Sequence, residues 1–179
     1  RGRKVLTLPG RLTRLKGHRD FIGLVAVLAR RGYNVHGLIV GHLDPARRTY
    51  VRELQQFIAS TGVQERITFT GRRRDMRDIY AVSDLVLSLS NKPDSFGRTV
   101  LEPLCLGIPV LGYDHGGVGE ILARLYPQGR CRAGDQAQLT EVVTGLLEHA
   151  VPVQETACFS LREMTDRTIE LYTALVYSN

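Results

Sequence analysis

Short apolar runs alternate with longer amphipathic segments along most of the 179-residue chain. The runs are rich in Val, Ile and Leu and cover residues 5–8, 35–40, 67–70, 85–89 and 109–111. Between the first two runs, apolar side chains recur at helical spacing, from Phe21 to Leu28. Strands and helices that alternate in this way form a parallel sheet with helices on both faces. We therefore expect an α/β fold with a Rossmann-like, doubly wound parallel sheet.

The same patterns predict the remaining elements. Helices are expected over residues 17–31, 75–81, 98–106 and 161–177, around residues 50–57 and 139–147, and from about residue 118. A short strand is expected over residues 129–132, and Gly112 is expected to end the strand before it. Pro103 falls inside a predicted helix, so we expect it in the first turn, with a helix start later than Arg98.

Composition excludes several classes of protein. With 43% hydrophobic and 23% charged residues, the chain is neither disordered nor fibrous. No apolar run approaches the roughly 18 residues that a membrane span needs, and no signal-peptide pattern opens the chain. Three cysteines lie far apart without a CxxC pair, which favours a reducing, cytoplasmic setting over a disulfide scaffold or zinc site.

Charge is distributed unevenly. The net charge is +6, but residues 1–90 hold 17 basic and 7 acidic groups, whereas residues 91–179 hold 7 basic and 11 acidic groups. A basic half of this kind favours phosphate-containing partners, including nucleic acid.

Ligands of such sheets bind at the carboxyl ends of the strands, which directs attention to five loops. The first loop, residues 9–17, has Gly10 and Gly17 near its ends, contains Arg11, Arg14 and Lys16, and precedes a helix. A helix N-terminus and arginine side chains both favour phosphate. A solvated basic loop is an equal alternative, because neither a Walker A loop nor a GxGxxG motif is present.

The fourth loop, residues 90–97, leads into the helix that contains Glu102. Asp94 and Glu102 lie eight residues apart, and helical geometry lets Glu102 face the same crevice as the loop. A carboxylate there could accept hydrogen bonds from a ribose diol, and the amides of Gly97, Arg98 and Thr99 could point at a phosphate. The alternative is that Asp94 is an ordinary loop residue and Glu102 an ordinary surface residue. For a pair of carboxylates considered without other motifs, this alternative is favoured.

The other loops are less specific. The fifth, residues 113–120, is glycine-rich and fits either amides that approach a ligand or a tight structural turn. In the third, Arg72, Arg73 and Arg74 fit phosphate, nucleic acid or a solvated face. The second, residues 41–45, is expected to be a plain turn. The five histidines lack metal-ligand spacing, and we expect His18 and His115 at the surface.

Taken together, these segments resemble the donor-binding domain of the group 1 (family 4) retaining glycosyltransferases. Those enzymes have the GT-B architecture, in which two Rossmann-like domains face each other across a cleft. The resemblance covers the whole chain and is carried by Gly10-Arg11, Lys16-Gly17, Phe69-Thr70-Gly71, residues 94–110 and residues 116–120.

The resemblance implies roles for individual residues. It places Arg11 and Lys16 on the diphosphate of a nucleotide sugar, Asp94 near the donor sugar and Glu102 on the ribose hydroxyls. Asp94 stands where Glu is commoner, which shortens its reach by one methylene. Further donor contacts implied are the segment at the helix start, with Ser95, Phe96, Gly97, Arg98, Thr99 and Val100, and the loops with Gly10, Gly71 and Arg72.

The resemblance also implies a function. A hexose would pass with retention from a nucleotide sugar, UDP being slightly favoured over GDP, to a glycan or lipid-linked acceptor of bacterial surface polysaccharide or lipopolysaccharide. No metal or other cofactor is required in such enzymes. The expected location is cytoplasmic, with peripheral association at the inner face of the membrane left open.

Domain organisation follows from the same resemblance. Residues 1–179 would form one nucleotide-sugar-binding domain, with residues 160–179 as a helix that crosses back to an N-terminal acceptor domain absent from this chain. Such a piece is expected to bind donor but to transfer sugar poorly. A nucleic-acid-binding module that uses Arg72, Arg73, Arg74 and Arg77, and a nucleotide-sugar epimerase, remain alternatives, although no nucleic-acid partner is expected.

Overall fold

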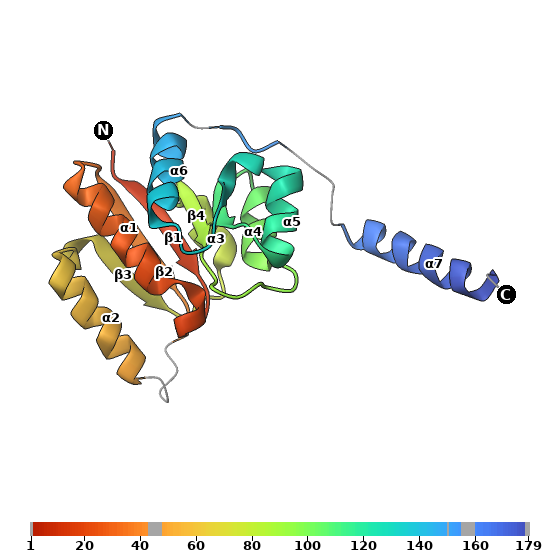
Figure 1. Ribbon diagram of the computed structural model, residues 1–179, viewed down its shortest axis with the longest axis horizontal. Helices are drawn as coiled ribbons and strands as arrows, with labels where there is room; N and C mark the ends of the chain where they lie inside the picture. Colours follow the sequence, from red (N-terminus) through yellow and green to blue (C-terminus); the bar gives the residue numbers. More distant parts are fainter. Residues whose placement is uncertain (1, 43–47, 150, 155–159, 178–179) are drawn as a thin grey trace.

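A computed structural model describes residues 2–42, 48–149, 151–154 and 160–177 of the chain. Its centre is a sheet of six parallel strands (Figure 1). The strands are β1 (Lys4–Pro9), β2 (Val35–Val40), β3 (Ile67–Gly71), β4 (Leu85–Ser88), β5 (Val110–Tyr113) and β6 (Arg130–Cys131). Their order in the sheet is β3-β2-β1-β4-β5-β6, and all neighbours pair in parallel. The expected doubly wound parallel sheet is confirmed.

Seven α-helices accompany the sheet in the described residues. They are α1 (His18–Arg30), α2 (Arg48–Thr61), α3 (Met76–Ala81), α4 (Arg98–Cys105), α5 (Gly116–Leu125), α6 (Gln136–Glu148) and α7 (Leu161–Tyr177). The side chains of α1, α2 and α6 share one hydrophobic core cluster, and those of α3, α4 and α5 share a second one. The sheet therefore lies between two helical layers.

Strand β4 shows how one short segment serves both layers. Leu85 and Leu87 belong to the core cluster under α1, whereas Val86 belongs to the cluster under α4 and α5. Successive side chains of a strand point to opposite faces, so a strand covered on both sides must be apolar throughout. This explains why the run over residues 85–89 shows no alternation of polar and apolar residues.

Strand order reverses between β1 and β4, which are neighbours in the sheet although they are far apart in the chain. Chain connections leave these two strands toward opposite sides, and a crevice opens at their carboxyl ends. The loops that enter this crevice are the first and fourth loops of the sequence analysis, residues 9–17 and 90–97.

Two local expectations were wrong. Gly112 does not end β5 but lies inside it, paired with Ser88 on one side and Arg130 on the other. Its lack of a side chain serves packing, because an added Cβ would lie 2.6 Å from Val118 Cγ1 of α5.

Pro103 is not in the first turn of its helix. Helix α4 begins at Arg98, and Pro103 is its sixth residue and is buried. A proline there removes the N–H that would pair with the Thr99 carbonyl. The loss is confined to one hydrogen bond because α4 ends two residues later, at Cys105, and the buried ring packs in the core.

Helix α7 lies apart from the sheet and its helical layers (Figure 1). It has no buried residue, and its apolar side chains Leu161, Met164, Leu171, Tyr172 and Leu175 are all at least 60% exposed. An ion pair of 3.5 Å between Arg124 and Glu163 links the start of α7 to α5. Among the described helices, none is long and apolar enough to cross a membrane.

His18, at the first position of α1, is fully buried and not at the surface as expected. Its Nδ1 lies 3.2 Å from the Thr13 carbonyl and 3.4 Å from the Tyr50 hydroxyl of α2. Burial lowers the pKa of His18 to about 4, a shift that nearby Lys16 supports and the Thr13 carbonyl opposes. His18 is therefore neutral at pH 7 and ties the first loop to α1 and α2.

This buried imidazole predicts a loss of stability in mild acid. The unfolded chain binds a proton at His18 below about pH 6.5, whereas the folded chain does so only near its pKa of about 4. Stability therefore falls as the pH drops through this window, by about 2 kcal/mol between pH 7.5 and 5. Urea titrations at both values should show a correspondingly smaller loss for His18→Asn, which keeps a donor but cannot ionise. The same change at exposed His149 is the control, and equal losses for wild type and His18→Asn would contradict the assignment.

Candidate nucleotide-binding site

The first three loops meet through backbone atoms at the carboxyl edge of the sheet. Gly10 N–H donates to the Val40 carbonyl at 2.9 Å, and Gly41 N–H donates to the Gly71 carbonyl at 3.1 Å. An added Cβ at Gly41 would lie only 1.8 Å from the Gly10 carbonyl oxygen. Gly41 thus contacts both the first and the third loop, whereas the predicted plain turn over residues 41–45 lies mostly outside the described residues.

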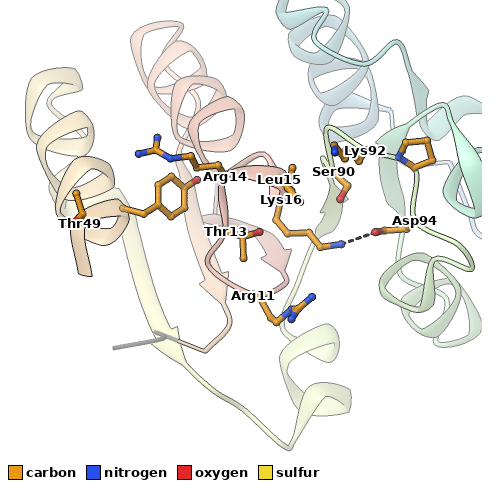
Figure 2. Close-up of a pocket in the computed structure, with 11 residues that line it drawn as sticks. Arg11, Thr13, Arg14, Leu15, Lys16, Thr49, Ser90, Lys92 and Asp94 are labelled. Atoms are coloured by element: carbon orange, nitrogen blue, oxygen red, sulfur yellow. Dashed lines mark hydrogen bonds and ion pairs between the residues drawn. The ribbon is translucent and has the colours of Figure 1, made fainter. Parts of the chain in front are cut away.

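The first and fourth loops meet across the crevice between β1 and β4. Asn91 N–H donates to the Leu15 carbonyl at 2.7 Å. Lys16 Nζ reaches across and donates to both oxygens of Asp94, at 2.7 and 2.9 Å (Figure 2). Both side chains are just over a quarter exposed. Two residues singled out in the sequence 78 positions apart are therefore direct partners.

Around this ion pair lies a pocket of about 620 Å³, which we call the lysine pocket. Among the described residues, its lining holds four cations, Arg11, Arg14, Lys16 and Lys92, and one carboxylate, that of Asp94. Arg14 is engaged by Glu53 at 2.7 Å and lies over the Tyr50 ring. The pocket is therefore strongly electropositive, as a phosphate subsite requires.

A second pocket of about 510 Å³, the glutamate pocket, adjoins the first and shares Arg11 with it. Its lining comes from the ends of β1 and β2, the third loop and helices α3 and α4. The residues include Gly10, Arg11, Gly41, His42, Arg72, Arg73, Met76, Tyr80, Arg98, Thr99 and Glu102. Glu102 and Asp94 thus lie in adjoining pockets, with Arg11 common to both.

The carboxylate of Glu102 is held by two partners. Arg98, one turn earlier on α4, donates to Oε1 from Nε at 3.0 Å and from Nη2 at 2.8 Å. Tyr80 of α3 donates its hydroxyl to Oε2 at 3.3 Å. Burial raises the pKa of Tyr80, and the Glu102 charge raises it further, so the phenol stays protonated as a donor.

Helix α4 begins beside both pockets. Gly97 is its N-cap in the left-handed region (φ 90°), and Arg98 and Thr99 are its first residues. The amide of Val100 donates to the Gly97 carbonyl at 2.9 Å and its side chain is fully buried, so the structure places Val100 in the core. Ser95 and Phe96 are exposed in the fourth loop. Of this segment, Arg98 and Thr99 line the glutamate pocket.

The glycine-rich fifth loop is a structural turn. Gly117 N–H donates to the Asp94 carbonyl at 2.9 Å, and an added Cβ on Gly117 would lie 2.4 Å from the Phe96 carbonyl oxygen. His115 Nε2 lies 2.8 Å from the Ser90 carbonyl. The fifth loop thus packs against the backbone of the fourth loop, and its residues line neither pocket.

The arginines of the third loop have different environments. Arg73 is paired with Asp75, and the Arg73 guanidinium lowers the pKa of that carboxyl. Arg72 and Arg73 line the glutamate pocket, whereas exposed Arg74 and Arg77 line neither pocket. Two arginines of this run therefore line the glutamate pocket, and two lie outside it.

Several residues that line the glutamate pocket were given no ligand role in the sequence analysis, among them His42, Met76 and Tyr80. His42 follows β2, so the rule that ligands bind at strand carboxyl ends could have identified it. Met76 and Tyr80 sit on α3 without a local motif, and only the packing of α3 beside α4 brings them to Glu102.

Fold and site together define a Rossmann-like domain with a cleft lined by basic side chains at the reversal of its strand order. Comparison with known proteins is more specific. The family model for glycosyl transferases group 1 matches residues 1–157, so the chain belongs to the group 1 glycosyltransferases. The resemblance seen in the sequence is thereby confirmed.

Individual relatives agree with this family. Mannosylfructose-phosphate synthase of Agrobacterium fabrum is 33% identical over 65% of this chain. The lipopolysaccharide core biosynthesis mannosyltransferase LpsB of Rhizobium meliloti is 26% identical over 63%. The crystal structure of Anabaena HepE in complex with UDP and glucose superposes with a TM-score of 0.76, at 28% identity over 82% of this chain. The matches span only 26%, 32% and 39% of these three proteins, respectively.

The contact between the fourth and fifth loops predicts a cost for any side chain at Gly117. Gly117→Ala must displace the Phe96 carbonyl, and overpacking of this kind costs about 1–3 kcal/mol. Gly145→Ala is a matched control, because Gly145 also lies in a helix but has nothing within 4 Å of an added Cβ. That change should stabilise by about 0.5–1 kcal/mol. Urea denaturation compares the two, and equal stabilities would contradict the tight contact.

Proposed function

We propose that this chain is the donor-binding domain of a nucleotide-sugar-dependent glycosyltransferase. The observation that carries the proposal is the position of Arg11 between two adjoining pockets, one holding Glu102 and the other the Lys16–Asp94 pair. A nucleotide sugar has the same order of parts: ribose, then diphosphate, then sugar. We assign the nucleoside to the glutamate pocket, the diphosphate to Arg11 and Lys16, and the sugar to the side of Asp94.

The chemistry required of such a domain is charge stabilisation. When the bond between the sugar and the diphosphate breaks, negative charge grows on the leaving diphosphate. Preorganised cations and helix amides aimed at that charge lower the barrier without any reorganisation during the reaction. Arg11, Lys16 and the start of α4 supply these groups here, which supports transfer without a metal or other cofactor.

Asp94 has a double role in this proposal. Both of its oxygens accept from Lys16, so it orients the ammonium group toward the diphosphate. A carboxylate has about four lone-pair sites, which leaves it able to accept from a sugar hydroxyl as well. Asp94, which the family resemblance implies at the sugar, therefore also holds Lys16, which it implies at the diphosphate.

The complete enzyme is proposed on family grounds. It would transfer a hexose with retention to a glycan or lipid-linked acceptor held by an N-terminal domain. LpsB supports a role in lipopolysaccharide or surface polysaccharide synthesis, and HepE supports UDP over GDP as the donor nucleotide. The exposed apolar side chains of α7 are proposed to pack on that acceptor domain. Enzyme location at the inner face of the cytoplasmic membrane is part of the same proposal.

Loss of either cation should weaken donor binding. A charged hydrogen bond contributes about 1.5–3 kcal/mol, so Arg11→Ala and Lys16→Ala should each reduce affinity roughly 10- to 100-fold. Calorimetric titration with UDP-glucose and GDP-mannose measures this and identifies the base. Arg74→Ala, in the arginine run but in neither pocket, is the control. Unchanged affinity in both pocket variants would refute the site, and failure of every nucleotide sugar to bind would refute the function.

Asp94→Asn should separate nucleotide from sugar recognition. The amide oxygen of Asn can still accept from Lys16 and orient it, so removing one negative charge beside the diphosphate should raise UDP affinity about 3-fold, as expected for a partly exposed charge interaction of under 1 kcal/mol. Weakening the sugar contact should lower the preference for UDP-glucose over UDP by about 5-fold. Asp114→Asn, which removes a carboxylate paired with Arg130 outside both pockets, should change neither quantity. An unaltered ratio of the two affinities in Asp94→Asn would place the sugar elsewhere.

A further inference from the structure

We propose that Tyr80 is a positioning residue that fixes the Glu102 carboxylate for recognition of the ribose diol. The inference rests on the proposed donor function and extends it to a residue outside every motif of the sequence. Its basis is that the two carboxylate oxygens of Glu102 are held from two different elements, Oε1 from α4 and Oε2 from α3.

Tyr80 and Arg98 restrain the Glu102 carboxylate to different degrees. Tyr80 is 2% exposed and belongs to the core cluster between α3, α4 and α5, so its ring has one position. Arg98 is 80% exposed, and its contact with Glu102 is an i,i+4 pair on the surface of α4. Exposed pairs of that kind hold their partners weakly, because solvent screens the charges. Arg98 alone would therefore leave the Glu102 side chain free to adopt other rotamers.

The buried phenol of Tyr80 is a hydrogen-bond partner with a fixed position, which exposed Arg98 is not. It fixes Oε2 from the floor of the same pocket that Glu102 lines, and with Oε1 held by Arg98 the plane of the carboxylate is set. Oε1 accepts two hydrogen bonds from Arg98 and Oε2 accepts one from Tyr80, so one lone-pair site of the carboxylate stays free, on Oε2. A hydroxyl of the ribose diol can donate to this oxygen, whose position is fixed before the ligand arrives, and preorganisation of this kind increases affinity.

The test compares two ligands that differ only in the ribose hydroxyls, UDP and 2′,3′-dideoxy-UDP. Wild type should prefer UDP. In Tyr80→Phe the affinity for UDP should fall about 3- to 10-fold, the effect of one modest hydrogen bond, while the affinity for the dideoxy nucleotide stays the same. A merely structural loss would weaken both ligands equally.

Two further variants complete the design. Tyr126→Phe removes the hydroxyl of another buried tyrosine, which donates to the Val151 carbonyl away from both pockets, and should leave the ligand preference unchanged. In a Glu102→Gln background, Tyr80→Phe should cause no additional loss of preference, because it acts through Glu102.

The outcomes separate the two proposals. Absence of UDP binding by wild type would overturn the donor function and this inference with it. If Tyr80→Phe binds UDP and prefers it over 2′,3′-dideoxy-UDP as strongly as wild type does, the role of Tyr80 alone is overturned. The same conclusion follows if wild type binds both nucleotides equally. An equal loss for both nucleotides in Tyr80→Phe, or additive losses in the double variant, would also reject positioning through Glu102.

Discussion

At the carboxyl edge of the sheet, the loops lie against one another through backbone atoms, and several of these contacts leave no room for a Cβ, among them that of Gly17 with the Leu89 carbonyl. Gly41 lies against the Gly10 carbonyl, and Gly117 lies against the Phe96 carbonyl. Such contacts fix loops more firmly than flexible side chains could, since the backbone atoms on both sides have few alternative positions. The first and fourth loops are thereby set at a distance at which Lys16 spans the crevice to Asp94. These backbone contacts between loops therefore determine where the charged side chains of the site lie.

Much of this arrangement could be predicted from the sequence, because it follows from periodicity and from one topological rule. The apolar run over residues 35–40 coincides with β2, and the runs around it locate the other long strands. Once strands are parallel and order reverses at β1, the loops with Lys16 and Asp94 must be neighbours. Their ion pair was not predicted, but their proximity was a direct consequence of the fold.

The remainder depended on tertiary contacts without a local pattern. Pro103 was expected at a helix start because a proline costs least there, yet it is buried at the sixth position of α4, where burial outweighs the loss of one hydrogen bond. His18 was expected at the surface because it follows a polar loop, but the packing of α2 covers it. Tyr80 precedes Glu102 by 22 residues, and no spacing rule links residues on two separate helices. In each case, the deciding partner comes from an element that local sequence cannot locate.

Charge pairing explains how a cleft that contains two carboxylates can still receive a diphosphate. At an effective dielectric constant of about 20, two like charges 4 Å apart repel by about 4 kcal/mol, enough to oppose binding strongly. Here Asp94 is compensated by Lys16 and Glu102 by Arg98, at 2.7 and 2.8 Å. The guanidinium of Arg11, for which the described residues supply no hydrogen bond or ion pair, then contributes a net positive charge where the two pockets meet. The carboxylates can therefore select hydroxyl groups on either side while the potential between them stays positive.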